Sequence, residues 1–205
     1  MKVSAILLGA GESKRIGVNK LTLPWGKKTV LEHCLQTLLQ SEVEEVIVVI
    51  NPHIQKRIFY PLSPKVKVVI NPSYQKGMST SLRKGLEAVD RRSDAILIAL
   101  GDQPLVKTKT INALVHAFAL RKRAIVIPTY RGMEGHPVVF SKIFKEALME
   151  IKGDRGGKSL IKRYPQEIWK VRIRSEGVVK DMDIWKDYKK ALRRGDSKVE
   201  RPAGA

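Results

Sequence analysis

The chain contains one cysteine, few acidic residues and no long apolar run. A single cysteine, Cys34, excludes a disulfide within the chain and any cysteine-rich metal site. No apolar run approaches the roughly 20 residues that cross a bilayer. The apolar run near the N-terminus is also too short for a secretory signal. These absences predict a protein of the cytoplasm that has no membrane partner.

Acidic residues are scarce relative to basic ones, because 20 Asp and Glu stand against 39 Lys and Arg, a net charge of +19. Such a surface attracts polyanions, among them nucleic acids and phosphorylated small molecules. The basic residues are spread along the whole chain, with no RNA-recognition pattern, zinc-finger spacing or alternation with aromatic residues. The charge therefore does not by itself indicate nucleic-acid binding.

Short apolar runs alternate with stretches of helical periodicity, which predicts an α/β protein. Strands are expected at residues 3–8, 45–50, 66–70, 95–100 and 124–127, the last stopped by Pro128. Helices are expected at 29–40, 53–60, 79–89 and from Thr108 to Phe118. Ser79, Thr80 and Ser81 are candidate caps for the third of these helices. Weaker signals favour strands at 136–140 and 168–173, an extended piece that begins at 178–179 and ends at 181–183, and helices at 141–151, 158–164 and 184–192.

The length of 205 residues suits a single domain, which we place at residues 1–192. Residues 193–205 carry no apolar period and are predicted to be a flexible basic tail. In a mostly parallel sheet, ligands bind beyond the carboxyl ends of the strands. That rule brings residues 9–20, 71–81 and 101–105 to one edge.

The most distinctive stretch follows the first strand. Gly9 to Gly11 ends the strand, and Lys14, Arg15 and Lys20 follow it closely. Bare backbone N–H groups beside several cations suit a polyphosphate. The dinucleotide fingerprint G-x-G-x-x-G fails at Lys14, and the P-loop pattern fails from either glycine. The pattern G-x-G-x-S-x-R-x-G-x-x-K is met in full, and the plainer alternative is a glycine-rich turn with surface lysines.

Asp102 comes directly after the strand expected at 95–100. A carboxylate facing a cationic loop needs a partner, and Mg²⁺, which takes few protein carboxylates, is the expected one. The alternative is a turn-forming Asp in Gly-Asp-Gln-Pro. Asp183 is the candidate second ligand, with a helix N-cap as its alternative. His136 either contacts an acceptor molecule or only fixes its own loop.

Six ordered segments resemble the MobA-like NTP transferases, and within them the molybdenum cofactor cytidylyltransferase group. They are LGAGESKRIGVNKLTLPWG, NPSYQKGMSTSLRKGL, LIALGDQPLV, RGMEGHPVVF, GDRGGKSLI and VVKDMDIWKDY. The resemblance implies a Rossmann-like, three-layer α/β/α nucleotidyltransferase fold with a mostly parallel mixed sheet. It implies Mg²⁺-dependent transfer of CMP from CTP to a phosphorylated acceptor, molybdopterin first among candidates, and a molybdoenzyme or chaperone as protein partner.

The resemblance also implies residue roles. Arg15, Lys20 and Asp102 would be catalytic, and Asp102 and Asp183 would bind Mg²⁺. The nucleotide would be bound by Leu8, Gly9, Ala10, Gly11, Ser13, Arg15, Lys20, Gly77, Met78, Ser81 and Asp102. The acceptor would be bound by Arg131, Gly135, His136 and Pro137.

The chain departs from the family pattern in two places. Leu8 to Gly11 replaces the usual Leu-Ala-Ala-Gly, which leaves the choice between CTP and GTP open. Ile184-Trp185 replaces the usual Thr-Pro after the last Asp. Other functions that stay open are a guanylyltransferase, a sugar- or polyol-phosphate nucleotidyltransferase, a basic nucleic-acid-binding protein and a non-catalytic nucleotide-binding protein.

Overall fold

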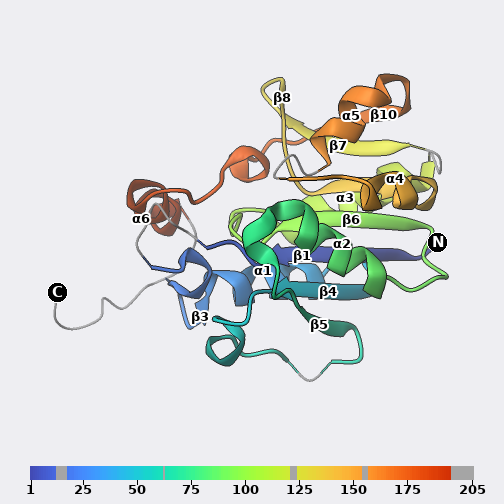
Figure 1. Cartoon of the computed structure of the whole chain (residues 1–205). Helices are drawn as coiled ribbons and strands as arrows, with labels where there is room; N and C mark the ends of the chain where they lie inside the picture. Colours follow the sequence, from blue (N-terminus) through green and yellow to red (C-terminus); the bar gives the residue numbers. More distant parts are fainter. Residues whose placement is uncertain (13–17, 62, 121–123, 154–156, 195–205) are drawn as a thin grey trace, which may run out of the picture.

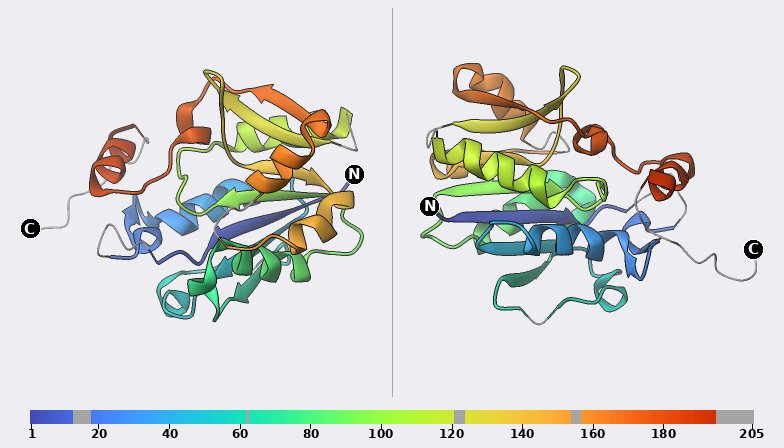
Figure 2. Two further views of the ribbon diagram at one scale, coloured as in Figure 1. Left: turned by 45° about the horizontal axis from the view of Figure 1, so that its top comes forward. Right: turned by 180° about the vertical axis from the view of Figure 1, so that it is seen from behind.

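A computed structural model describes residues 1–12, 18–61, 63–120, 124–153 and 157–194. These residues form three layers, with a sheet between two layers of helices (Figure 1). This is the Rossmann-like arrangement that the sequence predicts. One face of the sheet is covered by α1 (Val30–Leu39) and α3 (Thr108–Leu120), seen from behind in Figure 2. The other face is covered by α2 (Met78–Ala88), α4 (Lys145–Met149) and α5 (Lys158–Arg163).

The main sheet runs in the order β10-β7-β9-β6-β1-β4-β5, and β8 pairs with β7. Its strands are β1 (Val3–Gly9), β4 (Glu45–Ile50), β5 (Val66–Ile70), β6 (Ala95–Leu100), β7 (Ile125–Tyr130), β8 (Met133–Glu134), β9 (Val138–Ser141) and β10 (Ile168–Arg172). Strand β1 is parallel to β4 and β6, whereas β9 is antiparallel to both β6 and β7. The sheet is therefore mixed and mostly parallel.

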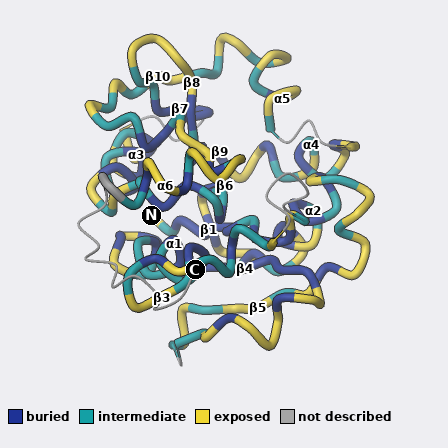
Figure 3. Tube along the Cα trace, turned by 90° about the vertical axis from the view of Figure 1, so that its left-hand side faces the viewer, coloured by how far each residue is buried: buried dark blue, intermediate teal, exposed yellow. Residues whose placement is uncertain are grey.

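The central strands are apolar on both faces because helices cover both faces. Ile6 of β1 is in register with Ile47 of β4 and Ile98 of β6, and all three are buried. Since these strands are parallel, their carboxyl ends meet at one edge, which faces the viewer in Figure 3. The candidate functional residues of β1 and β6 follow at that edge.

Helix α6 (Trp185–Arg194) lies at the same edge, away from the sheet (Figure 1). It packs on the hairpin of β2 (Pro24–Trp25) and β3 (Lys28–Thr29), where the Tyr188 hydroxyl donates to the Pro24 carbonyl at 2.5 Å. The helix runs through Arg194, two residues into the segment expected to be a tail. Residues 195–205 lie outside the described residues.

Four local expectations are wrong. Strand β7 continues through Pro128 to Tyr130, because its pairing with β9 ends at Val126 and no ladder bond on that side is lost. Helix α2 begins after Gly77 without a side-chain cap. The expected caps instead lie inside the helix, and the hydroxyl oxygens of Thr80 and Ser81 accept hydrogen bonds from Asn71 Nδ2.

The third wrong expectation concerns residues 178–179, which belong to a 3₁₀ turn, Glu176–Val179, and not to an extended piece. The turn begins at Ser175, whose hydroxyl accepts from the Gly177 N–H. The short helix expected at 53–60 is likewise only a 3₁₀ turn, Gln55–Arg57. In the described part of the chain, no helix is long and apolar enough to cross a bilayer.

Candidate active site

The loop after β1 follows Gly9, which packs closely against α1. A Cβ atom at Gly9 would lie 2.9 Å from Cδ1 of Leu31 in α1, so a side chain at this position would force the Leu31 side chain to move. The Ala10 carbonyl accepts a hydrogen bond of 3.0 Å from Nδ2 of the buried Asn51, which follows β4. Gly11 is exposed beyond this anchor. Ser13 and Arg15, both predicted to bind phosphate, lie outside the described residues.

Lys20, Asp102 and Asp183 meet at the edge of the sheet. Lys20 begins a 3₁₀ turn (Lys20–Thr22), which is capped by the side chain of Asn19. The Lys20 ammonium nitrogen lies 2.5 Å from Oδ2 of Asp102 and 2.9 Å from Oδ1 of Asp183. The two carboxylates are 81 positions apart in the sequence and converge on one cation. This proximity is the central expectation of the sequence analysis.

Burial and neighbouring charge shift the pKa values of this group. Burial raises the pKa of the Asp102 carboxyl, Lys20 opposes the shift, and the carboxylates of Asp181 and Asp183 add to it. Burial disfavours the charged form of Lys20, but Asp102 and Asp183 outweigh it, so the Lys20 pKa lies above its usual value. The side chains of Lys20 and Asp102 are 12% and 19% exposed, whereas that of Asp183 is 47% exposed. The ammonium group thus offsets carboxylates that would otherwise repel one another.

The two acidic segments are also joined through their backbones and a side chain. The Met182 N–H donates to the Asp102 carbonyl at 3.1 Å. Nε2 of Gln103 donates to Oδ1 of Asp181 at 2.6 Å. Helix α6 begins at Trp185, where the Asp187 carboxylate accepts from the Ile184 N–H. Asp183 therefore lies two positions before the first residue of α6, with Ile184 between them.

A cleft of about 600 Å³ opens beside this cluster. Among its lining residues are nine that the sequence analysis predicted: Leu8, Ala10, Gly11, Lys20, Gly77, Met78, Ser81, Asp102 and Asp183. Six others were missed: Glu12, Leu21, Tyr74, Gln75, Leu100 and Asp181. All six lie inside the segments that carry the family resemblance, so membership of those segments was the available signal.

Asn71 organises the side of the cleft formed by the start of α2. Its Nδ2 atom donates to the Ser81 hydroxyl at 2.9 Å, and its Oδ1 atom accepts from the Ser73 N–H at 3.0 Å. Asn71 is buried at the end of β5, so it links the sheet edge to the loop that carries Tyr74. The sequence analysis placed this residue at the same edge, in the stretch 71–81, but gave it no role of its own.

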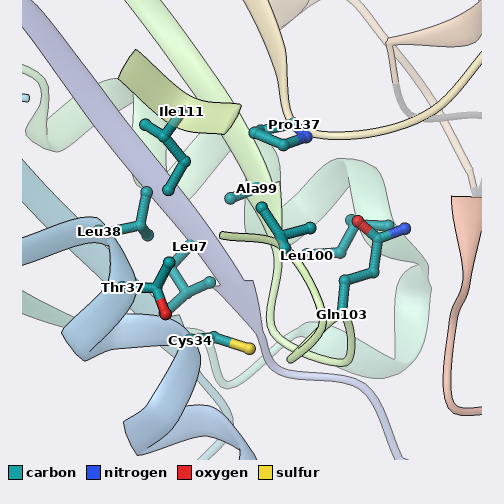
Figure 4. Close-up of a pocket in the computed structure, with 10 residues that line it drawn as sticks. Leu7, Cys34, Thr37, Leu38, Ala99, Leu100, Gln103, Ile111 and Pro137 are labelled. Atoms are coloured by element: carbon teal, nitrogen blue, oxygen red, sulfur yellow. The ribbon is translucent and has the colours of Figure 1, made fainter. Parts of the chain in front are cut away.

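The four predicted acceptor residues do not line this cleft. Arg131 is exposed, with its guanidinium carbon 5.4 Å from the ring centroid of Tyr130. Gly135 and His136 line a separate cavity of about 40 Å³. Pro137 lines a third cavity, of about 20 Å³, which Figure 4 shows.

Gly135 and His136 are held against the chain that leads to Asp183. A Cβ atom at Gly135 would lie 2.0 Å from the Val178 carbonyl oxygen, and the His136 N–H donates to the same oxygen at 2.8 Å. Burial lowers the pKa of His136, while Asp181 opposes the shift and Lys158 adds to it. Asp181 therefore acts electrostatically on His136 and also lines the large cleft.

The donor set is compatible with a divalent cation. Two carboxylates point at one position, which the Lys20 ammonium takes. Mg²⁺ is commonly held by one or two carboxylates, with water and substrate phosphates completing its shell. Among the described residues, no group of three or more His, Cys, Asp or Glu side chains forms a metal site by itself. Water or a substrate would therefore have to complete the shell of a cation here.

The fold is one found in nucleotidyltransferases. The sequence model of the family described as "MobA-like NTP transferase domain" matches residues 5–168. The chain belongs to this family of nucleotidyltransferases. The matched region contains the glycine loop, Lys20 and Asp102, whereas Asp183 follows it.

Two curated relatives show how far the likeness extends. The molybdenum cofactor cytidylyltransferase of Escherichia coli (strain K12) is 28% identical over 140 residues, which are 68% of this chain and 70% of that protein. The nicotine blue oxidoreductase of Paenarthrobacter nicotinovorans is 26% identical over 190 residues, 88% of this chain and 92% of that protein. Proteins with different named activities are thus similar to this chain.

A solved structure confirms the fold over almost the whole chain. The crystal structure of Rv0371C from Mycobacterium tuberculosis H37Rv, in complex with manganese, has a TM-score of 0.77 and 24% sequence identity. The match covers 94% of this chain and 99% of that chain.

Proposed function

We propose that the chain transfers CMP from CTP to a phosphorylated acceptor, with release of pyrophosphate, and that the acceptor is molybdopterin carrying molybdenum. The observation that carries the proposal is the convergence of Asp102, Asp183 and Lys20 on the cleft of about 600 Å³ that Gly11 also lines. Backbone N–H groups beside a cation, close to paired carboxylates, suit a triphosphate and its divalent ion.

Asp102 and Asp183 would hold Mg²⁺ in this proposal. The ion, when bound, supplies positive charge where the reaction places negative charge on phosphate oxygens. The manganese in the Rv0371C crystal structure supports a divalent ion in this fold. Because the Lys20 ammonium pairs with both carboxylates, it has to leave them when the ion binds.

The residues of the chain would act mainly by positioning and electrostatics. An acceptor phosphate oxygen attacks the α-phosphorus of CTP in line, the bond to the β-phosphate oxygen breaks, and that oxygen leaves with pyrophosphate. Lys20, released from the carboxylates, would neutralise the charge that grows on the leaving group, beside Arg15. The N–H groups of residues 9–11, with Ser13, would bind the β- and γ-phosphates.

The remaining contacts are assigned by class. Gly77, Met78 and Ser81 would lie near the ribose and the base, which is consistent with their place in the cleft wall. Arg131, Gly135, His136 and Pro137 would bind the acceptor. Burial favours a neutral His136 at neutral pH, which suits a hydrogen bond to the acceptor better than pairing with its phosphate.

The similarity to the E. coli cytidylyltransferase supports CTP and the molybdenum cofactor as substrates. The similarity to an oxidoreductase shows why the product has to be measured, since one fold hosts unrelated chemistries. The fold alone therefore does not establish the substrates.

Pyrophosphate release tests the proposal directly. Purified protein is incubated with CTP or GTP, with or without molybdenum cofactor, and with Mg²⁺ or EDTA. We expect release only with CTP, cofactor and Mg²⁺ together. Release with GTP and not with CTP would indicate a guanylyltransferase. No release with either nucleotide would contradict the molybdenum cofactor as the acceptor. RNA affinity that falls with salt and is unchanged in the Asp102→Asn variant would favour a nucleic-acid-binding protein.

A further inference from the structure

Gln103 is a buried polar residue that the mechanism above does not use. It follows Asp102, is only 3% exposed, and its Nε2 atom lies 2.6 Å from Oδ1 of Asp181. Asp181 itself is exposed and lies two positions before Asp183. This hydrogen bond therefore connects the loop that contains Asp102 to the segment that contains Asp183. The side chain that makes the connection is almost completely buried.

The amide oxygen of Gln103 indicates that packing by itself does not explain a glutamine at this position. Its Oε1 atom is buried and has no hydrogen-bond partner among the described residues. Burying an unpaired amide oxygen costs free energy that an apolar side chain of similar size would avoid. The donated bond to Asp181 is thus the feature that a glutamine provides here and a methionine would not.

The inner side of the Asp102 loop borders a small cavity. A cavity of about 20 Å³ lies there, lined by Gln103 together with Cys34, Thr37, Leu100 and Pro137. Figure 4 shows the Gln103 amide directed away from Cys34 and Thr37. The hydrogen bond to Asp181 is therefore a side-chain contact by which this buried residue reaches the 181–183 segment.

We propose that Gln103 is a positioning residue that sets the separation of Asp102 and Asp183 through its hydrogen bond to Asp181. The proposal rests on the proposed function, because it concerns the carboxylates assigned there to the metal ion. The backbone bond from Met182 to the Asp102 carbonyl, at 3.1 Å, fixes one point of the junction, and the Gln103–Asp181 bond fixes a second. Two points are needed to fix the orientation of the 181–183 segment as well as its distance.

Mn²⁺ affinity in the presence of CTP, measured by electron paramagnetic resonance on the full chain, tests this role. Residues that orient metal ligands typically change affinity by about 10- to 100-fold when removed. We expect Gln103→Met and Asp181→Leu each to weaken Mn²⁺ binding by about tenfold or more. The double variant should be no weaker than either single variant, because both remove the same bond.

Asp181→Asn is the matched control for charge. It is as neutral as Asp181→Leu but keeps an acceptor oxygen for Gln103, so we expect Mn²⁺ affinity within about threefold of wild type. Because Asp181 is exposed, both variants should fold, and thermal unfolding without metal checks this. The exchanged pair, Gln103→Glu with Asp181→Asn, reverses donor and acceptor at constant charge and should bind Mn²⁺ more tightly than Gln103→Glu alone.

Two results would overturn the positioning role. One is wild-type Mn²⁺ affinity in Gln103→Met. The other is an equal loss in Asp181→Asn and Asp181→Leu, which would show that the charge of Asp181 matters and its hydrogen bond does not. A wild-type protein that binds no Mn²⁺ with CTP would instead contradict the proposed function, so the two failures are distinguishable.

Discussion

The Lys20 ammonium nitrogen lies 2.5 Å from Oδ2 of Asp102, at the position that a divalent cation would take between Asp102 and Asp183. A residue expected to contact phosphate is thus paired with the residues expected to contact metal. Under the proposed function, binding of a nucleotide with its metal ion would exchange these partners. The free energy of the ion pairs would oppose metal binding until the phosphates offered Lys20 a new partner.

Lys20→Met tests this exchange. Without nucleotide, the variant should bind Mn²⁺ about tenfold more tightly, because about 1.4 kcal/mol of ion-pair free energy is no longer given up. The KM for CTP should rise, because the phosphates lose a cation. Isothermal titration measures the first effect and steady-state kinetics the second. Lys28→Met, which removes an exposed lysine outside the cluster, is the matched control, and unchanged Mn²⁺ affinity in Lys20→Met would contradict the exchange.

Asp102→Asn should reduce pyrophosphate release by about 100-fold or more, because a preorganised charge in the site is lost. Its far-ultraviolet circular dichroism should match wild type, since asparagine has nearly the same shape. Asp94→Asn, at the other end of β6, serves as the control for a lost carboxylate. Activity near wild type in Asp102→Asn would remove this residue from the mechanism.

Glu45 provides a pH-dependent contribution to stability far from the site. Burial alone would raise its pKa, but Lys67, Ser4 and the Asp90 N–H outweigh burial, so the folded-state pKa lies below the usual value of 4.5. The carboxylate accepts from Ser4 Oγ at 2.5 Å and pairs with Lys67 at 2.7 Å. A depressed pKa stabilises the fold above the unfolded-state pKa, and this contribution is lost as the pH falls through the folded-state pKa.

Glu45→Gln should therefore lower the free energy of unfolding by about 1–2 kcal/mol at neutral pH. The difference from wild type should shrink below about pH 4. Urea unfolding at several pH values measures both effects. A difference that stays constant down to acid pH would mean that the charge of Glu45 contributes nothing to stability.

Cys34 should be unreactive in the folded protein. Burial raises the pKa of its thiol, Asp102 adds to the shift, and Sγ donates to the Gly101 carbonyl at 3.4 Å. Because the thiolate is the reactive form, alkylation at pH 8 should be at least about 100-fold slower than for a free thiol. The same reagent in urea should label one equivalent. Fast labelling of the folded protein would mean that the Asp102 loop opens readily.

Some elements could be read from local sequence alone. The runs that became β1, β4 and β6 are apolar at nearly every position, so a buried strand was the consistent interpretation. The capping box of Thr29 and Glu32 likewise fixes the start of α1 within four residues. By contrast, β9 lies between β6 and β7 as an antiparallel strand. No local sequence pattern predicts the order of strands across a sheet.

The sequence by itself determined the class of fold and the approach of the Lys20 loop to Asp102, because parallel strands bring their carboxyl ends together whatever lies between them. For Asp183, only the resemblance to the family indicated a place beside them. Only the tertiary structure decided that Lys20 pairs with both carboxylates, that Gln103 contacts Asp181, and that the expected acceptor residues lie outside the large cleft. These contacts join segments about 80 residues or more apart, and their geometry depends on how the intervening elements pack.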